Sequence, residues 1–127
     1  MKLKSLIVPA LLLLITSVPL FAHHGTSAMD IGKKVVLKGV VTDWQWQNPH
    51  SILKFDAKDD SGNIVHWSAE ANNPADMVER GWSKQSIKVG DEITITVEPV
   101  KNGKPVGRIL QIVFANGTIL NNSYPKQ

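Results

Sequence analysis

The sequence predicts an all-β domain with one short helix, folded as a five-stranded Greek-key barrel of the OB-fold type. Five segments are rich in β-branched and aromatic residues or alternate apolar with polar residues, and clusters of Gly, Asn and Asp separate them. The one helical segment falls between the third and the fourth of these strands. The order β-β-β-α-β-β is that of the OB-fold, and an open β-sandwich is the alternative.

The first 22 residues have the layout of a secretory signal peptide. Lys2 and Lys4 precede an apolar run, Leu6–Leu20, and Ala22 supplies the small residue at the cleavage point. The run is shorter than the roughly 18 to 20 residues that span a bilayer, and two prolines interrupt it. We therefore expect cleavage after Ala22, no membrane insertion of the product, and a periplasmic or secreted location; residues 26–28 form a second candidate site.

The first three strands follow in order along the chain. Residues 34–46 form a long strand in which Gly39 allows a bend or a bulge. Asn48-Pro49 ends it, because proline cannot donate to a ladder and restricts the residue before it. Residues 51–58 and 64–71 are separated by a turn cluster, so they form a hairpin.

The helix and the last two strands complete the fold. Asn73 can cap a helix, Pro74 suits its first position, and Gly81 suits its exit, so a helix of about two turns is expected. Residues 92–98 alternate isoleucine and valine with polar residues, and residues 106–114 form the fifth strand after a turn. A single domain, residues 23–127, follows from these elements.

Composition narrows the function classes. The chain has no cysteine, so the 105 residues after the leader must be held together by packing alone. Two of the 14 basic residues leave with the leader, which leaves 12 against 11 acidic residues and no basic patch for nucleic acid. No nucleophile elbow, phosphate loop or zinc-protease helix is present. We therefore expect a binding protein with no catalytic residues.

Several motifs together resemble a family of small exported bacterial proteins, domain of unknown function 6152. They are "AHHG", "GVVTDWQWQNPHS", "VHWSAEANNPADMVERGW" and "VGDEITITVEPVKNGKPVG", which span the chain from His23 to about Leu120. The resemblance implies export and a small β-barrel, and no established activity. The positions that match its motifs are His23, His24, Trp46, Asn48, Pro49, His50, Trp67, Glu70, Pro74, Arg80, Gly81, Trp82, Gly90 and Asp91.

Cleavage after Ala22 would make His23 the first residue and suggests a metal site. An N-terminal histidine can chelate one ion through its α-amine and Nδ1, and that amine is partly deprotonated near neutral pH. Nitrogen ligands favour copper among the divalent metals. His24 and His50 are the expected further ligands, and Met29 could add a thioether for copper(I). A pair of histidines at a terminus can also be merely solvated.

A second hypothesis uses the loop after the first strand for a different ligand. Trp46, Asn48 and His50 could hold a small polar molecule or a protein partner, since OB-folds bind ligands with this loop. Trp67 and Trp82 are expected to be structural, because large aromatic residues dominate small cores. A structural or adaptor role in an envelope complex is the third option.

Overall fold

The computed structural model describes residues 28–122. The proposed leader, residues 1–22, lies outside the described residues, as do His23 and His24. The described chain contains six strands and one helix, in the order β1 (Val35–Gln45), β2 (Ile52–Lys58), β3 (Ile64–Glu70), α1 (Pro74–Glu79), β4 (Glu92–Pro99), β5 (Val106–Phe114) and β6 (Ile119–Asn121).

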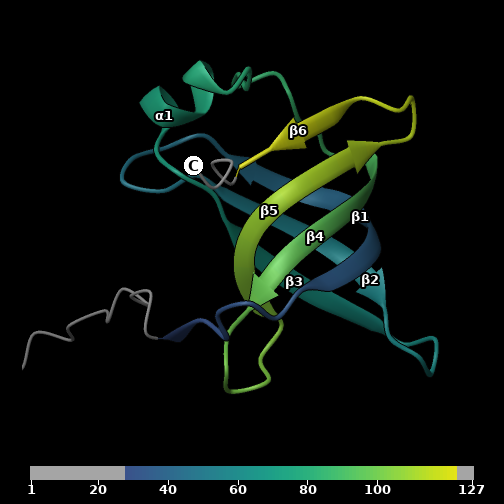
Figure 1. Cartoon of the computed structure of the whole chain (residues 1–127). Helices are drawn as coiled ribbons and strands as arrows, with labels where there is room; N and C mark the ends of the chain where they lie inside the picture. The colour runs from purple at the N-terminus through teal and green to yellow at the C-terminus, as the bar shows by residue number, and fades with distance from the viewer. Residues whose placement is uncertain (1–27, 123–127) are drawn as a thin grey trace, which may run out of the picture.

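The strands form one sheet that closes into a barrel (Figure 1). The sheet order is β3-β2-β1-β4-β5-β6, and every neighbouring pair is antiparallel. A parallel pairing of β3 with β5, residues 68–70 with residues 106–108, closes the barrel. The predicted fold class, a five-stranded OB-fold-like barrel with its helix between β3 and β4, is confirmed.

Strand β1 belongs to both halves of the barrel, and Gly39 lies where the two halves meet. Its first half pairs with β4 and its second half with β2, and Gly39 is in register with Ile93 on one side and Ala57 on the other. A Cβ at this position would lie 2.7 Å from the carbonyl oxygen of Asp56 and 2.8 Å from the ring of Phe55. Glycine is therefore needed for close approach, and the register shift comes later, between Val41 and Asp43.

The core fills the barrel with side chains from alternate positions on every long strand. Trp82, just after α1, is 2% exposed and donates from its indole nitrogen to the carbonyl of Asn121 at 2.9 Å. Trp67 is half-buried and stacks on Phe55 with ring centroids 6.2 Å apart. Both tryptophans are structural, as predicted. The other large buried side chains are Leu53, Met77, Ile95, Ile109, Ile112, Val41 and Val97.

Three features differ from the sequence prediction or extend it. β6 is a short sixth strand that pairs with β5 after the turn at residues 115–118, in addition to the five strands that the sequence predicts. Pro99 lies inside β4 as its last residue, and its carbonyl accepts from the Asp30 amide at 2.8 Å. Met29 is 3% exposed and forms a bridge with Val100, so its sulfur is not available as a ligand.

Residues 28–33 form a strap along the end of β4. The Lys101 amide donates to the carbonyl of Ala28 at 3.0 Å, and the Gly32 amide donates to Glu98 at 3.3 Å. Glu98 is buried and accepts from Arg108 at 2.5 Å. The strap therefore covers an ion pair and fixes Ala28 against the barrel, five residues after His23.

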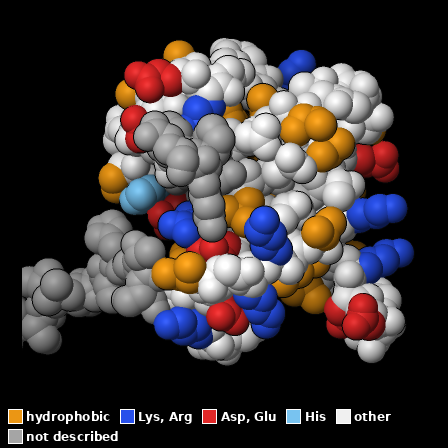
Figure 2. Space-filling view, in the orientation of Figure 1, with side chains coloured by type: hydrophobic (Ala, Val, Ile, Leu, Met, Phe, Trp, Pro, Cys, Tyr) orange, Lys and Arg blue, Asp and Glu red, His pale blue; other side chains and the backbone are white. Residues whose placement is uncertain are grey.

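Two ion pairs between lysine and carboxylate lie exposed at the surface. Lys33 lies 3.8 Å from Asp30, and Lys54 lies 4.0 Å from Asp43. Basic and acidic side chains are interspersed over the face in Figure 2. Exposed pairs of this kind contribute about 0 to 1 kcal/mol each, so packing of the core, and not surface charge, stabilises the barrel.

Helix α1 is short and capped as the sequence predicts. The side chain of Asn73 accepts from the Asp76 amide at 3.0 Å, and Pro74 occupies the first turn. Met77 faces the core. Within residues 28–122, no helix has the length and apolar character to cross a membrane.

Candidate functional site

The loop between β1 and β2 is tied to the segment that follows β3. Ser51 is fully buried, its amide donates to the carbonyl of Asn72 at 3.1 Å, and its carbonyl accepts from the Ala71 amide at 2.8 Å. Its hydroxyl oxygen accepts from the Gln47 amide at 3.3 Å, and the peptide bond between Asn48 and Pro49 is cis. The hydrogen bonds of Ser51 with Gln47, Ala71 and Asn72 hold the backbone on both sides of His50.

His50 faces the end of β3. Its Nδ1 lies 3.2 Å from the carbonyl oxygen of Ala71 and 3.2 Å from Oε1 of Glu70. A carbonyl oxygen can only accept, so the contact with Ala71 requires that Nδ1 carries the proton. In the neutral ring, Nε2 then keeps its lone pair, and 46% of the side chain is exposed.

This arrangement suits a metal ligand. Histidines that bind metals usually donate their other ring nitrogen to a carboxylate or a carbonyl, which fixes the tautomer and strengthens the free nitrogen as a donor. Glu70 and Ala71 supply both kinds of acceptor. The register of β2 with β3, which places Ile52 opposite Glu70, is what brings the carboxylate to His50.

His66 provides an internal comparison. Its Nδ1 lies 2.5 Å from Oδ1 of Asp56, and its side chain is 84% exposed on the outer face of β3. Lys54 and Lys58 lie two residues on either side of Asp56, on the same face of β2. His66 therefore faces a carboxylate, as His50 does. The two nearby lysines would repel a metal ion, so His66 is the less suitable ligand.

The tryptophan of the predicted ligand loop is used in packing. Trp46 is half-buried against Trp44 with ring centroids 5.9 Å apart, and Trp44 packs against Trp82 at 6.2 Å. Asn48 is exposed. The structure thus places Trp46 in an aromatic row that continues into the core and leaves Asn48 and His50 at the surface.

A second set of contacts joins α1 to the same loop. Arg80, at the end of α1, donates to the backbone carbonyl of Asn122. With its amide oxygen turned toward Arg80, Asn72 accepts from Nη1 at 2.6 Å and from Nη2 at 2.8 Å. Asn72 in turn accepts from Ser51, the neighbour of His50. Arg80 therefore buttresses the site from behind, and Figure 1 shows α1 and this loop at the same end of the barrel.

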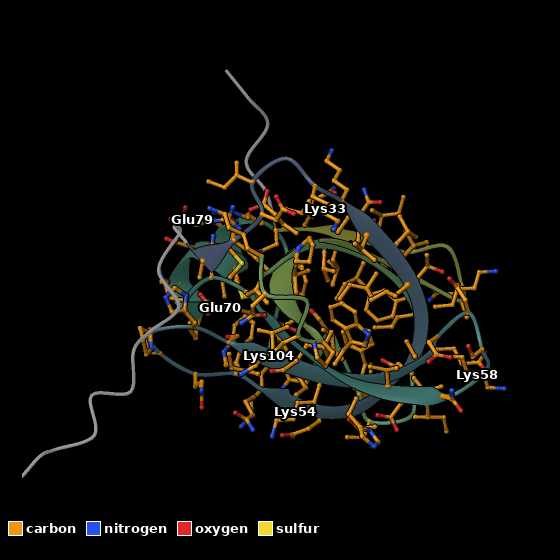
Figure 3. All side chains as sticks on the ribbon, turned by 90° about the horizontal axis from the view of Figure 1, so that it is seen from below. Lys33, Lys54, Lys58, Glu70, Glu79 and Lys104 are labelled. Carbon is orange, nitrogen blue, oxygen red and sulfur yellow. The ribbon has the colours of Figure 1, made fainter. Side chains whose placement is uncertain are left out.

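A surface groove lies away from this loop. A groove of about 740 Å³ runs over β1, β2 and the ends of β4 and β5, with Val36, Val40, Ile64 and Lys58 among its lining residues. None of Trp46, Asn48 and His50 lines it. In Figure 3, Glu70 and Lys58 lie on opposite sides of the barrel, which separates the groove from the histidine site.

Of the three predicted metal ligands His23, His24 and His50, only His50 lies within the described residues. Within residues 28–122, no three His, Asp or Glu side chains converge as a metal site. His50 and Glu70 are close together, whereas the other two predicted ligands, His23 and His24, lie outside the described residues. The sequence did not predict that Glu70 and Asn72 contact His50 and its loop, because these contacts depend on strand register and on loop packing.

The chain was compared with known families and structures. The model of a family of unknown function, DUF6152, matches residues 11–109. The chain belongs to DUF6152. The match covers the loop after β1, all of β3 and α1, and so includes the His50 and Glu70 pair of this DUF6152 protein. The curated proteins and the solved structures give no significant match.

Proposed function

We propose that this protein is an exported, periplasmic β-barrel that binds a transition metal, copper, through the mature N-terminal histidine together with His24 and His50. The observation that carries the proposal is the orientation of His50, which directs Nδ1 to a carbonyl and a carboxylate and leaves Nε2 for a metal. The function proposed is binding, with no reaction assigned to the protein.

The anchor of the N-terminal strap supports this combination of residues. Backbone pairings connect the strap to β3 in three steps. Met29 pairs with Val100, Val100 with Val106, and Val106 with Ser68. At about 4.8 Å per step, Met29 and Ser68 are at most about 14 Å apart along the sheet, and Glu70 is two residues further along β3. The distance from Met29 to Glu70 is therefore about 16 Å or less.

The length of the chain before Ala28 can be compared with that distance. Five residues, 23–27, precede Ala28, which the Lys101 amide holds, and five extended residues span about 17 Å. The length of this segment is therefore comparable to the distance from the strap to Glu70, the neighbour of His50, and this supports the proposal. The amine and ring nitrogen of His23, the ring of His24 and Nε2 of His50 would give an all-nitrogen donor set, which suits copper.

The test is a copper(II) titration of the processed protein that begins at His23, with two matched histidine variants. His50→Ala is expected to weaken binding by more than about tenfold, which corresponds to about 1.4 kcal/mol. His66→Ala removes a histidine with the same type of carboxylate partner and is expected to leave the affinity unchanged. Equal affinities for the two variants would reject His50 as a ligand and favour the other use of this loop, a polar or protein ligand.

A second pair of variants tests the orienting carboxylate. Glu70→Gln is expected to lower copper affinity about 10 to 100-fold, the usual cost of losing a group that orients a metal-bound histidine. Asp56→Asn makes the equivalent change beside His66 and is expected to have no effect. A loss of affinity in both variants would point to a general effect of charge and not to the site.

A further inference from the structure

We infer that the groove over β1, β2 and the ends of β4 and β5 binds a free fatty acid through its carboxylate and its hydrocarbon chain. Figure 3 shows Lys58, which lines the groove, and Glu70 on opposite sides of the barrel, so this site is separate from the proposed metal site. The groove volume of about 740 Å³ is within the roughly 300 to 1,000 Å³ of small-molecule sites. A pair of lysines set among exposed apolar side chains carries the inference.

The two lysines occupy opposite positions on neighbouring strands. Gly39 on β1 is in register with Ala57 on β2, and the next positions in these antiparallel strands are Lys38 and Lys58, which both line the groove. Like charges at opposite positions destabilise a sheet. Within residues 28–122, neither lysine forms an ion pair with a carboxylate. An anionic group bound between them would remove the repulsion, and the hydroxyl of Thr94, in register with Lys38, is a further hydrogen-bond donor.

Apolar side chains surround the lysine pair. Val36, Val40 and Ile64 are 63%, 42% and 60% exposed, and all three line the groove. Buried Ile93 and half-buried Phe114 line it further in. Single exposed apolar residues are ordinary on a protein surface, but several in one hollow mark a binding site. A hydrocarbon chain laid against these side chains would remove their apolar surface from water, which favours binding.

The carboxylates of the groove limit the ligand to one anionic group. Asp56 is occupied by His66, whose Nδ1 lies 2.5 Å from it. Asp60 lies in the turn after β2, and Glu92, at the start of β4, is in register with Val40. These groups would repel a second negative charge, so the groove suits an anionic head on a neutral tail and disfavours a polyanion.

The test is calorimetric titration of the protein with dodecanoate below its micelle concentration. The double variant Lys38→Gln/Lys58→Gln is expected to weaken binding at least about fivefold, the effect of losing two partly exposed ion pairs. Lys84→Gln/Lys88→Gln removes the same charge from exposed positions outside the groove and is expected to leave the affinity unchanged. Octanoate, which has four fewer methylenes, is expected to bind at least about tenfold more weakly than dodecanoate. Dodecyltrimethylammonium has the same tail with a cationic head and is also expected to bind more weakly. Thermal unfolding of both double variants checks that they are folded.

Four results would overturn the inference. They are the absence of dodecanoate binding, equal affinities for dodecanoate in the two folded double variants, equal affinities for the carboxylate and the ammonium amphiphile, and equal affinities for dodecanoate and octanoate. Binding to vesicles of phosphatidylcholine and phosphatidylglycerol without binding of dodecanoate would assign the groove to a membrane surface instead. A dimer in solution that Lys38→Gln/Lys58→Gln dissociates would assign it to a second copy of the chain. The copper titrations test the proposed function separately, so either proposal can fail without the other.

Discussion

Replacement of Gly39 by alanine is expected to destabilise the barrel by about 1 to 2 kcal/mol. The added Cβ would lie 2.7 Å from the Asp56 carbonyl oxygen and 2.8 Å from a ring carbon of Phe55, well inside the roughly 3.5 to 4.0 Å of favourable carbon contacts. Phe55 is fully buried and cannot turn outward, and Asp56 belongs to the β1–β2 ladder, so the backbone must move.

The magnitude follows from two opposing effects. Overpacking of a close-packed core costs about 1 to 3 kcal/mol. Alanine also restricts the unfolded chain, which returns about 0.4 to 1 kcal/mol. The steric cost is larger, so the net effect is a loss. In a domain of this size each 1 kcal/mol lowers the melting temperature by about 4 to 8 °C, so a fall of roughly 5 to 15 °C is expected.

Urea denaturation followed by tryptophan fluorescence measures this loss, and the slope of the transition should stay unchanged because the fold is retained. The matched control is Lys38→Ala, the exposed neighbour on the same strand, which should change stability by less than about 0.5 kcal/mol. If Gly39→Ala proved as stable as the parent protein, the close approach of β1 to β2, and with it the reason given for this glycine, would be wrong.

Three further substitutions test the packing described above. Asn73→Ala removes the cap of α1 and is expected to cost about 1 kcal/mol in thermal unfolding. Trp82→Phe leaves the carbonyl of Asn121 without its donor, so a loss of about 1 to 3 kcal/mol is expected, and an unchanged midpoint would contradict the hydrogen bond. Arg108→Ala leaves the buried Glu98 with the Gly32 amide but without its cation, and is expected to cost about 3 kcal/mol, the low end of the range for a buried pair, because Arg108 is partly exposed. A gain in stability would show that the pair is dispensable.

Most of the fold could be predicted because its signals are local. Alternation in residues 92–98 and the turn clusters of Gly, Asn and Asp define strands and hairpins without knowledge of their partners. Asn73 and Pro74 mark the start of the helix for a reason that lies within one turn of chain. The bounds of these elements agree with the structure to within one or two residues.

The features that could not be predicted depend on contacts between distant segments. β6 has only three residues, too few for a pattern, and is a strand only because β5 offers it an edge. The strap that covers Glu98 is set by its bonds to the end of β4. The residues 28–33 that form it carry no alternating pattern.

The candidate site likewise has one part that local sequence features predict and one part that depends on contacts between distant segments. His50 was predicted from its residue type and its proline-stiffened loop, which are local features. Its partner Glu70 lies 20 residues away, and the register of β2 with β3, which no local pattern specifies, brings the two together. The prediction that Met29 could be a copper(I) ligand was wrong, because the strap buries its side chain. No local pattern in the sequence indicates this burial.

The central claim is that cleavage creates a ligand that the uncut chain lacks. The most direct measurement is the copper(II) dissociation constant of the form that begins at His23 beside that of a form with one extra alanine in front. Loss of the free histidine amine is predicted to weaken binding at least about tenfold, or 1.4 kcal/mol. Equal dissociation constants would contradict the account, because the α-amine of His23 would then have no part in holding the metal.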